Sequence, residues 1–413
     1  MFQTKKLIRW QTEGTCANFG KVDVAQFAAM LVGGGFMQEM TPLIVGAGPV
    51  GLGAAFLLRR AGIATRIVDQ AVQPAAESKA LAVNPRTLEL LESSGITQEM
   101  LGIGIRVVGV RIQFDAKRSA QIPLDSLQHK YPFMLALSQA TTENLLGAGL
   151  KAAGGNVERG TELLRCWNNG DFVEAELKHG ETTEIVQCSW LLAADGAHSA
   201  ARKSLNIPFN GDSFEKPWHL ADIPLKTGLE ENLAHVFFRN HGQFMFMIRV
   251  VDEHSEQSGG PKLWRIFSNS PDLTKDVPES IPAGAPAWSS EFKISHRINE
   301  HMTVGKVYFA GDAAHIHSPL GARGMNLGLE DAWVFSRLAQ ANRLQDYGRL
   351  RMPCDRSVVK RVEFFSRMVM NQSSVTRLLR SFFLTSMAKT PFIRNKFLAA
   401  VTGLDHQVDI ERI

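Results

Sequence analysis

The sequence of 413 residues predicts an α/β fold: a parallel sheet flanked by helices, an inserted antiparallel sheet and a helical C-terminal region. Three observations support this prediction. A short apolar run at 43–45 ends in glycine and precedes a helical pattern, as in a βαβ unit. Strand-like pieces broken by Gly and Pro fill residues 210–297, which is typical of an antiparallel sheet. Helical patterns dominate after residue 327.

Strands and helices alternate in the predicted parallel-sheet region. A helix over Val50–Arg60 ends before Gly62, and a second strand at 64–68 leads to Asp69. The same patterns predict further helices at 85–95, 141–153 and 327–338, and further strands at 172–177, 184–192 and 306–310. The pieces of the antiparallel sheet are predicted at 234–238, 244–251 and 263–268.

These changes of pattern set the predicted domain bounds. The parallel-sheet domain takes residues 40–115, 135–209 and 300–345, the antiparallel sheet takes 116–134 and 210–299, and the helical region takes 346–413. Residues 1–39 show no clear period and precede the first strand, and Met40 lies immediately before that strand. We expect this extension to be disordered or to reflect an incorrectly assigned start.

Composition is that of an ordinary globular protein, with 45% hydrophobic and 21% charged residues. The four cysteines form no C-x-x-C pair, which argues against a disulfide framework or zinc site and for a reducing compartment. No apolar run approaches the roughly 18–20 residues of a membrane span. We therefore expect a cytoplasmic protein with no nucleic-acid partner.

The net charge of +4 is unevenly distributed. Between Arg343 and Lys396, Lys and Arg outnumber Asp and Glu by 12 to 3, with phenylalanines interspersed. We interpret this stretch as helices packed on the main body with arginines in solvent. A basic amphipathic helix in peripheral contact with an anionic membrane is the alternative.

A glycine-rich segment follows the first predicted strand. Gly46, Gly48 and Gly51 form G-x-G-x-x-G, in which the glycines allow a tight turn, a close pyrophosphate and close helix–strand packing. The phosphates would lie at the helix N-terminus, where free N–H groups favour negative charge. Asp69, 18 residues after Gly51, would bind ribose hydroxyls and repel a 2′-phosphate. The nucleotide is therefore NAD or FAD.

Two further glycine-bearing segments end apolar strands. The run 189–194 ends at Asp195-Gly196, a pair that suits a turn as well as a nucleotide contact. The run 307–310 ends at Gly311-Asp312, whose carboxylate is suited to a ribityl hydroxyl. After it, Pro319, Gly321 and Gly324 form a loop, and Met325-Asn326 begin a helix. The free N–H groups there would stabilise the N1–C2=O edge of an isoalloxazine ring. The rival interpretation is that this loop and helix bind a pyrophosphate, but the first βαβ unit already serves as the pyrophosphate site. The three segments together therefore favour FAD.

In this order and at these distances, the segments resemble the class A flavoprotein monooxygenases, the family of para-hydroxybenzoate hydroxylase and the ubiquinone-biosynthesis hydroxylases. The resemblance runs from about Thr41 to the C-terminal region and implies a glutathione-reductase-like, Rossmann-type FAD domain with an inserted substrate sheet. It implies cofactor contacts at Gly46, Gly48, Gly51, Asp69, Lys79, Gln139, Asp195, Gly196, Gly311, Asp312, Pro319, Gly321, Gly324, Met325 and Asn326.

The resemblance also implies a FAD-dependent NAD(P)H:O2 monooxygenase. NAD(P)H would reduce FAD, O2 would add at flavin C4a, and the hydroperoxide would hydroxylate an aromatic, polyketide or quinone-like substrate. No side chain need act as a nucleophile, and the backbone of Gly321, Gly324, Met325 and Asn326 would act on the ring. The chain departs from the family at three positions: Lys79 and His198 stand where arginine is usual, and Arg323 stands where glutamine is frequent.

No side chain is an evident base for a phenolic substrate. The three tyrosines are poorly placed, and the histidines of the sheet region are interpreted as surface or core residues: His219, His235, His241 and His296. The pair His315-x-His317 has no third ligand nearby in the sequence, so we expect no metal.

Other function classes remain open at this point. A reductase of the same fold would insert no oxygen, and a non-catalytic flavin-binding accessory protein would bind FAD without substrate-stimulated NAD(P)H oxidation. An NAD-only dehydrogenase would be colourless and would not take up FAD.

Overall fold

The computed structural model describes residues 40–74, 80–113, 119–239, 243–251, 261–274, 277, 281–370 and 390–406. The chain divides into two compact units, Met1–Met40 and Thr41–Ile413, and the elements of the fold belong to the second. The predicted extension 1–39, the family position Lys79 and the candidate His241 lie outside the described residues.

A six-stranded sheet in the order β19-β20-β12-β1-β2-β8 carries the first strand of the chain. Its strands are β1 (Leu43–Val45), β2 (Arg66–Asp69), β8 (Val157–Arg159), β12 (Leu191–Ala193), β19 (Thr303–Val304) and β20 (Val307–Phe309). All neighbours from β20 to β8 run parallel, and β19 pairs antiparallel with β20. β1, β12 and β20 are apolar and fully buried, as strands covered on both faces must be. The predicted βαβ unit at 43–69 is confirmed.

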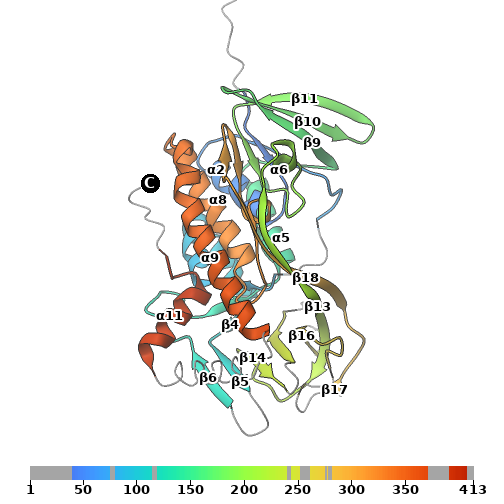
Figure 1. Cartoon of the computed structure of the whole chain (residues 1–413), viewed down its shortest axis with the longest axis vertical. Helices are drawn as coiled ribbons and strands as arrows, with labels where there is room; N and C mark the ends of the chain where they lie inside the picture. Colours follow the sequence, from blue (N-terminus) through green and yellow to red (C-terminus); the bar gives the residue numbers. More distant parts are fainter. Residues whose placement is uncertain are drawn as a thin grey trace, which may run out of the picture. The chain divides into compact units, whose positions relative to one another are not determined.

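The α-helices of the described ranges are α2 (Pro49–Arg60), α3 (Pro85–Leu91), α4 (Ile96–Ile103), α5 (Gln139–Ala152), α6 (Ala200–Ser204), α8 (Gly324–Gln340), α9 (Tyr347–Met370) and α11 (Pro391–Thr402). α8 contacts both α2 and α9, and α8 and α9 run side by side in Figure 1. Gly53 permits the close α2–α8 approach, because a Cβ there would lie 3.0 Å from Leu329 Cδ2.

A larger, mainly antiparallel sheet takes the order β21-β18-β13-β16-β15-β14-β5-β6, with β17 beside β13. Its strands are β5 (Gly109–Gln113), β6 (Ser119–Pro123), β13 (Phe209–Lys226), β14 (Leu233–Phe238), β15 (Phe244–Arg249), β16 (Lys262–Ser268), β17 (Ile281–Pro282), β18 (Trp288–Asn299) and β21 (His315–Ile316). One face buries an aromatic cluster in which Trp218 stacks on Phe267 with ring centroids 4.5 Å apart. A small sheet of β3 (Ala82–Val83), β7 (Met134–Ala136) and β4 (Ile105–Val107) completes the unit.

The prediction of one strand over 184–192 is wrong. The chain instead forms β11 (Thr182–Cys188), which joins β9 (Thr161–Asn168) and β10 (Val173–His179) in an antiparallel sheet, and then enters β12. The two parts differ in burial, since β11 is mostly exposed and β12 is fully buried. The chain passes from one sheet to the other at Trp190, whose carbonyl already accepts the N–H of Leu43 in β1 at 3.0 Å.

Candidate functional site

Four parallel strands end in register at one edge of the six-stranded sheet. Cross-strand pairing aligns the last residues of β20, β12 and β1 with Val68 of β2. The predicted site residues that follow these ends therefore share one edge: Gly46, Asp69, Asp195 and Gly311. In open α/β sheets, ligands bind in the crevice outside the carboxyl ends of the strands.

The three glycines of the first segment are needed for different structural reasons. A Cβ at Gly46, where φ is +99°, would lie 2.2 Å from the carbonyl oxygen of Ala194, and a Cβ at Gly51 would lie 1.8 Å from that of Gly46. Gly48 is different, because no described atom lies within 4 Å of its Cβ position. Gly46 and Gly51 are required by the fold, whereas Gly48 leaves space for a ligand.

The N-terminus of α2 lies at this space. Among the described residues, no side chain caps α2, and its first turn holds no acidic residue. Asp69 accepts the N–H of Ala47 at 2.5 Å and that of Ala71 at 2.8 Å. Its carboxylate therefore also holds the turn between β1 and α2, and Arg159 lies 3.7 Å from Oδ1.

Gln139, the first residue of α5, lies in the same region. Its Nε2 donates to Glu143 at 2.8 Å, and its Oε1 accepts the N–H of Ala80 at 3.4 Å. Burial raises the pKa of Glu143, while Gln139 and the charge of Arg159 oppose the rise and the charge of Asp69 adds to it. Gln139 therefore contacts the Glu143 carboxyl, whose pKa responds to the charges of Arg159 and Asp69.

Asp195 caps the short helix α6. One carboxylate oxygen accepts the N–H groups of Ala200 at 2.8 Å and Ala201 at 3.2 Å. Within the described residues its Oδ1 is buried without a hydrogen-bond partner. Burial raises the pKa of Asp195 against the opposing effects of the Ser199 side chain and of the Ala200 and Ala201 N–H groups. A buried acceptor without a partner is costly, so a ligand hydroxyl here would stabilise the site.

Arg202 joins the Asp195-Gly196 segment, the second motif, to the third motif, which comprises the Gly311 turn and the loop up to Asn326. Its guanidinium donates to the carbonyls of Ala197 at 2.6 Å and Ala313 at 3.1 Å, and it lies over the Phe209 ring at 4.0 Å. His198, the neighbouring departure from the family pattern, is exposed.

The Gly311 turn packs tightly between two helices. Gly311 has a φ of +58°, and a Cβ there would lie 2.8 Å from Val50 Cγ2 of α2. A Cβ at Gly328 of α8 would lie 2.5 Å from the same Val50 atom. The N–H of Gly311 donates to Asp331 of α8 at 3.0 Å, and Asp312 beside it is exposed. The starts of α2 and α8 therefore converge on this turn.

The loop before α8, residues 319–323, has a left-handed backbone. Gly321 has a φ of +88° and Ala322 a φ of +51°, and the N–H of Ala322 donates to the Pro319 carbonyl at 2.9 Å. In the described chain, no side chain caps α8 and its first turn holds no acidic residue. The N–H groups of Gly324 and Met325 thus open a second helix N-terminus with positive potential.

Asn326 holds this helix start in place. Its amide donates to the carbonyls of Ala82 at 2.8 Å and Ala322 at 2.7 Å, and its Oδ1 accepts the N–H of Asn84 at 2.9 Å. The Asn326 side chain is therefore used within the protein, and only its backbone is left to contact a cofactor. Arg323 also points into the protein, towards Ala400 and Asp405.

His317 and His296 have buried ring nitrogens, and of the two interpretations given for His296, surface residue or core residue, the structure supports the core residue. His317 donates from Nδ1 to the Ser318 carbonyl at 2.9 Å, and in the described part of the structure its Nε2 is buried without a partner. The same holds for both ring nitrogens of His296, which is 4% exposed. Burial lowers the pKa of His317 to about 3 and that of His296 to about 4.

Tyr347 is not suited to act as a base. Its hydroxyl donates to the Phe309 carbonyl, and burial raises its pKa.

The expectation that His315 has no third metal-type ligand nearby is wrong. His315 Nε2 lies 2.8 Å from Asp331 Oδ2 and 3.9 Å from Asp355 Oδ2, because α8 and α9 bring both carboxylates to β21. The buried guanidinium of Arg351 binds the same two carboxylates, each at 2.7 Å. Burial lowers the pKa of His315, but these carboxylates raise it to about 9. His315 and Arg351 therefore offset the negative charge from within the chain, and we maintain the prediction of no metal.

Comparison with known proteins identifies the family. The model of the FAD binding domain family matches residues 39–361. A 6-methylpretetramide 4-monooxygenase of Streptomyces rimosus is 34% identical over 302 residues, which are 70% of this chain and 54% of the relative. An uncharacterized aromatic compound monooxygenase of Bacillus subtilis is 27% identical over 404 residues, 91% of this chain and 78% of that protein.

Solved structures agree on the fold. The p-nitrophenol 4-monooxygenase of Pseudomonas putida DLL-E4 superposes with a TM-score of 0.76 at 17% identity, covering 89% of this chain and 99% of that one. This chain belongs to the FAD binding domain family, and the predicted resemblance to class A flavoprotein monooxygenases is confirmed. The chain spans about half the length of the Streptomyces relative.

None of the helices in the described ranges is long and apolar enough to span a membrane.

Sequence reasoning missed the side chains that hold the three motifs together. Arg202 lies seven residues after Asp195 and Asp331 lies five residues after Asn326, so closeness to these segments was the signal that could have found them. Asp405, the partner of Arg323, gave no signal because it lies 82 residues away in the chain.

Proposed function

We propose that this chain is a FAD-dependent monooxygenase that uses NAD(P)H and O2 to hydroxylate an aromatic or polyketide-like small molecule. The main support is the geometry at one edge of the six-stranded sheet. Four parallel strands end there in register, and the uncapped N-termini of α2 and α8 converge on the same edge. Family membership and relatives named as monooxygenases of aromatic and tetracycline-type compounds support it.

The residues of this edge fit FAD. Gly46, Gly48 and Gly51 with the start of α2 would hold the pyrophosphate, and Asp69 with Gln139 would hold the adenosine side. Asp195, through its unpaired oxygen, and Asp312 would accept ribityl hydroxyls, with Gly196 and Gly311 forming their turns. We assign the isoalloxazine ring to the residues from Pro319 to Asn326: Pro319, Gly321, Gly324, Met325 and Asn326. Bound FAD supplies the electron transfer and oxygen chemistry.

The protein's own contribution is positioning and electrostatics. The open N-terminus of α8 offers preorganised positive potential at no reorganisation cost. We assign residues 40–115, 135–209 and 300–345 to FAD binding and residues 116–134 and 210–299 to the substrate, with the helical region 346–413 as a third part. The structure corrects these bounds at two strands, because β5 (Gly109–Gln113) and β21 (His315–Ile316) pair in the antiparallel sheet.

The test is a purification followed by kinetics. The protein should be yellow or take up FAD, and aromatic and polycyclic phenols should be screened for stimulated NAD(P)H oxidation. Product mass must increase by one oxygen atom per NAD(P)H consumed in coupled turnover. A colourless protein that cannot be reconstituted with FAD contradicts the proposal. FAD binding without an oxygenated product for any stimulating compound would indicate a reductase.

A further inference from the structure

The C-terminal segment Pro391–His406 packs against residues that hold the start of α8. Gly403 ends α11 with a φ of +81°. A Cβ there would lie 2.7 Å from Nδ2 of Asn84, so the Gly403 backbone packs closely against the Asn84 side chain. Asn84 in turn donates its N–H to Asn326. The segment is therefore in contact with the frame of the third motif.

Arg323 joins loop 319–323 to this segment. Its side chain is 3% exposed, and its Nη1 donates to the Ala400 carbonyl and to Asp405 Oδ1, the latter at 3.2 Å. Asp405 also pairs with Arg361 of α9 at 2.9 Å. Burial raises the pKa of Asp405, but His406 and the two arginines outweigh it and hold the pKa below its usual value. Asp405 is therefore an ionised partner for Arg323.

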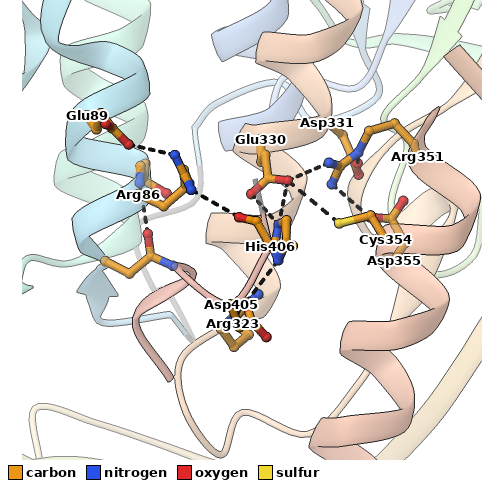
Figure 2. A network of polar contacts seen from close by, with 12 residues as sticks. Arg86, Glu89, Arg323, Glu330, Asp331, Arg351, Cys354, Asp355, Asp405 and His406 are labelled. Carbon is orange, nitrogen blue, oxygen red and sulfur yellow. Dashed lines mark hydrogen bonds and ion pairs between the residues drawn. The ribbon is translucent and has the colours of Figure 1, made fainter. Parts of the chain in front are cut away.

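His406 connects the same segment to α8, as Figure 2 shows. Its Nδ1 lies 2.9 Å from Asp405 Oδ1 and its Nε2 lies 2.8 Å from Glu330 Oε1, while its carbonyl accepts from Arg86 at 3.0 Å. Burial lowers the pKa of His406, but its contacts with Asp405, Cys354 and Glu330 raise it to about 11. At neutral pH both ring nitrogens are protonated and donate.

The contacts continue to the Gly311 turn. Arg351, which is fully buried, binds Glu330 and lies 2.7 Å from Asp331 Oδ1. The other oxygen of Asp331 accepts the N–H of Gly311. Both parts of the third motif, the turn and loop 319–323, are thus linked by buried charges to the two residues 405 and 406.

We propose that Asp405 and His406 are positioning residues for the flavin site, and that the C-terminal segment sets the conformation of loop 319–323 through Arg323. This inference rests on the proposed function, since it assigns the loop to FAD. A buried charge that loses its partner must move or take in water. When Arg323 moves, the N–H groups that begin α8 move with it.

The experiment measures FAD binding to four full-length proteins by fluorescence titration: wild type, Asp405→Asn, Arg323→Gln and the double variant. Asp346→Asn is the matched control, because it breaks the pairs of a half-buried aspartate with Arg343 and Arg349 away from the motif. Asp405→Asn should raise the dissociation constant for FAD by about tenfold. The double variant should bind better than the product of the single effects predicts, since the two residues act as a pair. Thermal unfolding and the visible absorption spectrum of bound flavin are recorded for each protein.

A purely structural role makes a different prediction. It lowers the melting temperature of Asp405→Asn but leaves the FAD dissociation constant within twofold of wild type and the flavin spectrum unshifted, and that result overturns the inference. If Asp405→Asn does not fold, Arg323→Gln carries the test of the loop contact, because it removes the same pair from the side of the loop. His406→Asn then tests the separate link to Glu330. Failure of wild type to bind FAD refutes the proposed function instead.

Discussion

Replacing Gly48 with alanine separates ligand binding from folding. An alanine Cβ there meets no described atom within 4 Å, and the φ of −76° with a ψ of −174° is open to any residue. At Gly51 the Cβ would lie 1.8 Å from the carbonyl oxygen of Gly46. We therefore expect Gly48→Ala to leave the FAD-free protein folded and to weaken FAD binding, because the methyl group takes the space into which a pyrophosphate must come.

The magnitude follows from the contacts that the methyl group at Gly48 displaces. Hydrogen bonds to charged groups contribute about 1.5–3 kcal/mol each, so losing one or two costs about 3 kcal/mol. At about 1.4 kcal/mol per factor of ten, the FAD dissociation constant rises roughly 100-fold. Alanine caps a helix less well than glycine but restricts the unfolded chain more. These effects, each about 0.5–1 kcal/mol, nearly cancel in the stability of the FAD-free protein.

The assay is a fluorescence titration of FAD into FAD-free protein, with thermal unfolding of the same samples. Gly147→Ala in α5 is the control, because its Cβ position is equally open and lies within a helix. The control should bind FAD as wild type does. Wild-type affinity in Gly48→Ala would refute the assignment of this space to the pyrophosphate, and so would a loss of stability as large as that of Gly51→Ala.

Three further outcomes are expected. Asn326→Ala removes three hydrogen bonds to backbone groups. It should weaken FAD binding about tenfold and lower the melting temperature, as measured by titration and thermal unfolding. Unchanged affinity would contradict the role of Asn326 at the start of α8. Asp195→Ala should destabilise α6 by about 1 kcal/mol in chemical unfolding and weaken FAD binding beyond that of the α6-capping control Ser199→Ala. Because the pKa of His406 is raised to about 11, its stabilisation is complete below about pH 6.5 and is lost as pH rises towards 11. The melting temperature of wild type should therefore fall more steeply than that of His406→Asn between about pH 7 and pH 10, and parallel curves would contradict this.

The first glycine segment was predictable because its requirements are local. Gly46 must turn with a positive φ directly after a buried strand, and Gly51 must let α2 pass over that turn, so strand, glycines and helix are contiguous. The strands β1, β12 and β20 were predictable for the same reason, since each is a short apolar run ending near glycine. Their common edge follows from parallel pairing once their order is known.

The contacts between motifs were not predictable, because their partners are distant in the chain. Arg202 reaches Ala313 across 111 residues, and Asn326 reaches Ala82 across 244. A single polar residue at such a distance carries no period or spacing signal. The strand at 184–192 failed for a related reason: alternation and apolarity both favour a strand, but only the fold decides that β11 and β12 belong to different sheets.

The backbone of the third motif explains why it needs partners from so far away. Ala322 holds a φ of +51°, a conformation that costs a residue with a Cβ about 1–3 kcal/mol and persists only where surrounding contacts impose it. Its own turn supplies one hydrogen bond, from Ala322 N–H to Pro319. The next residue, Arg323, is buried against Ala400 and Asp405, and Asn326 binds the Ala322 carbonyl at 2.7 Å. The loop conformation that opens the N-terminus of α8 is therefore imposed from α8 and from the C-terminal segment, which is why both carry buried polar side chains at these positions.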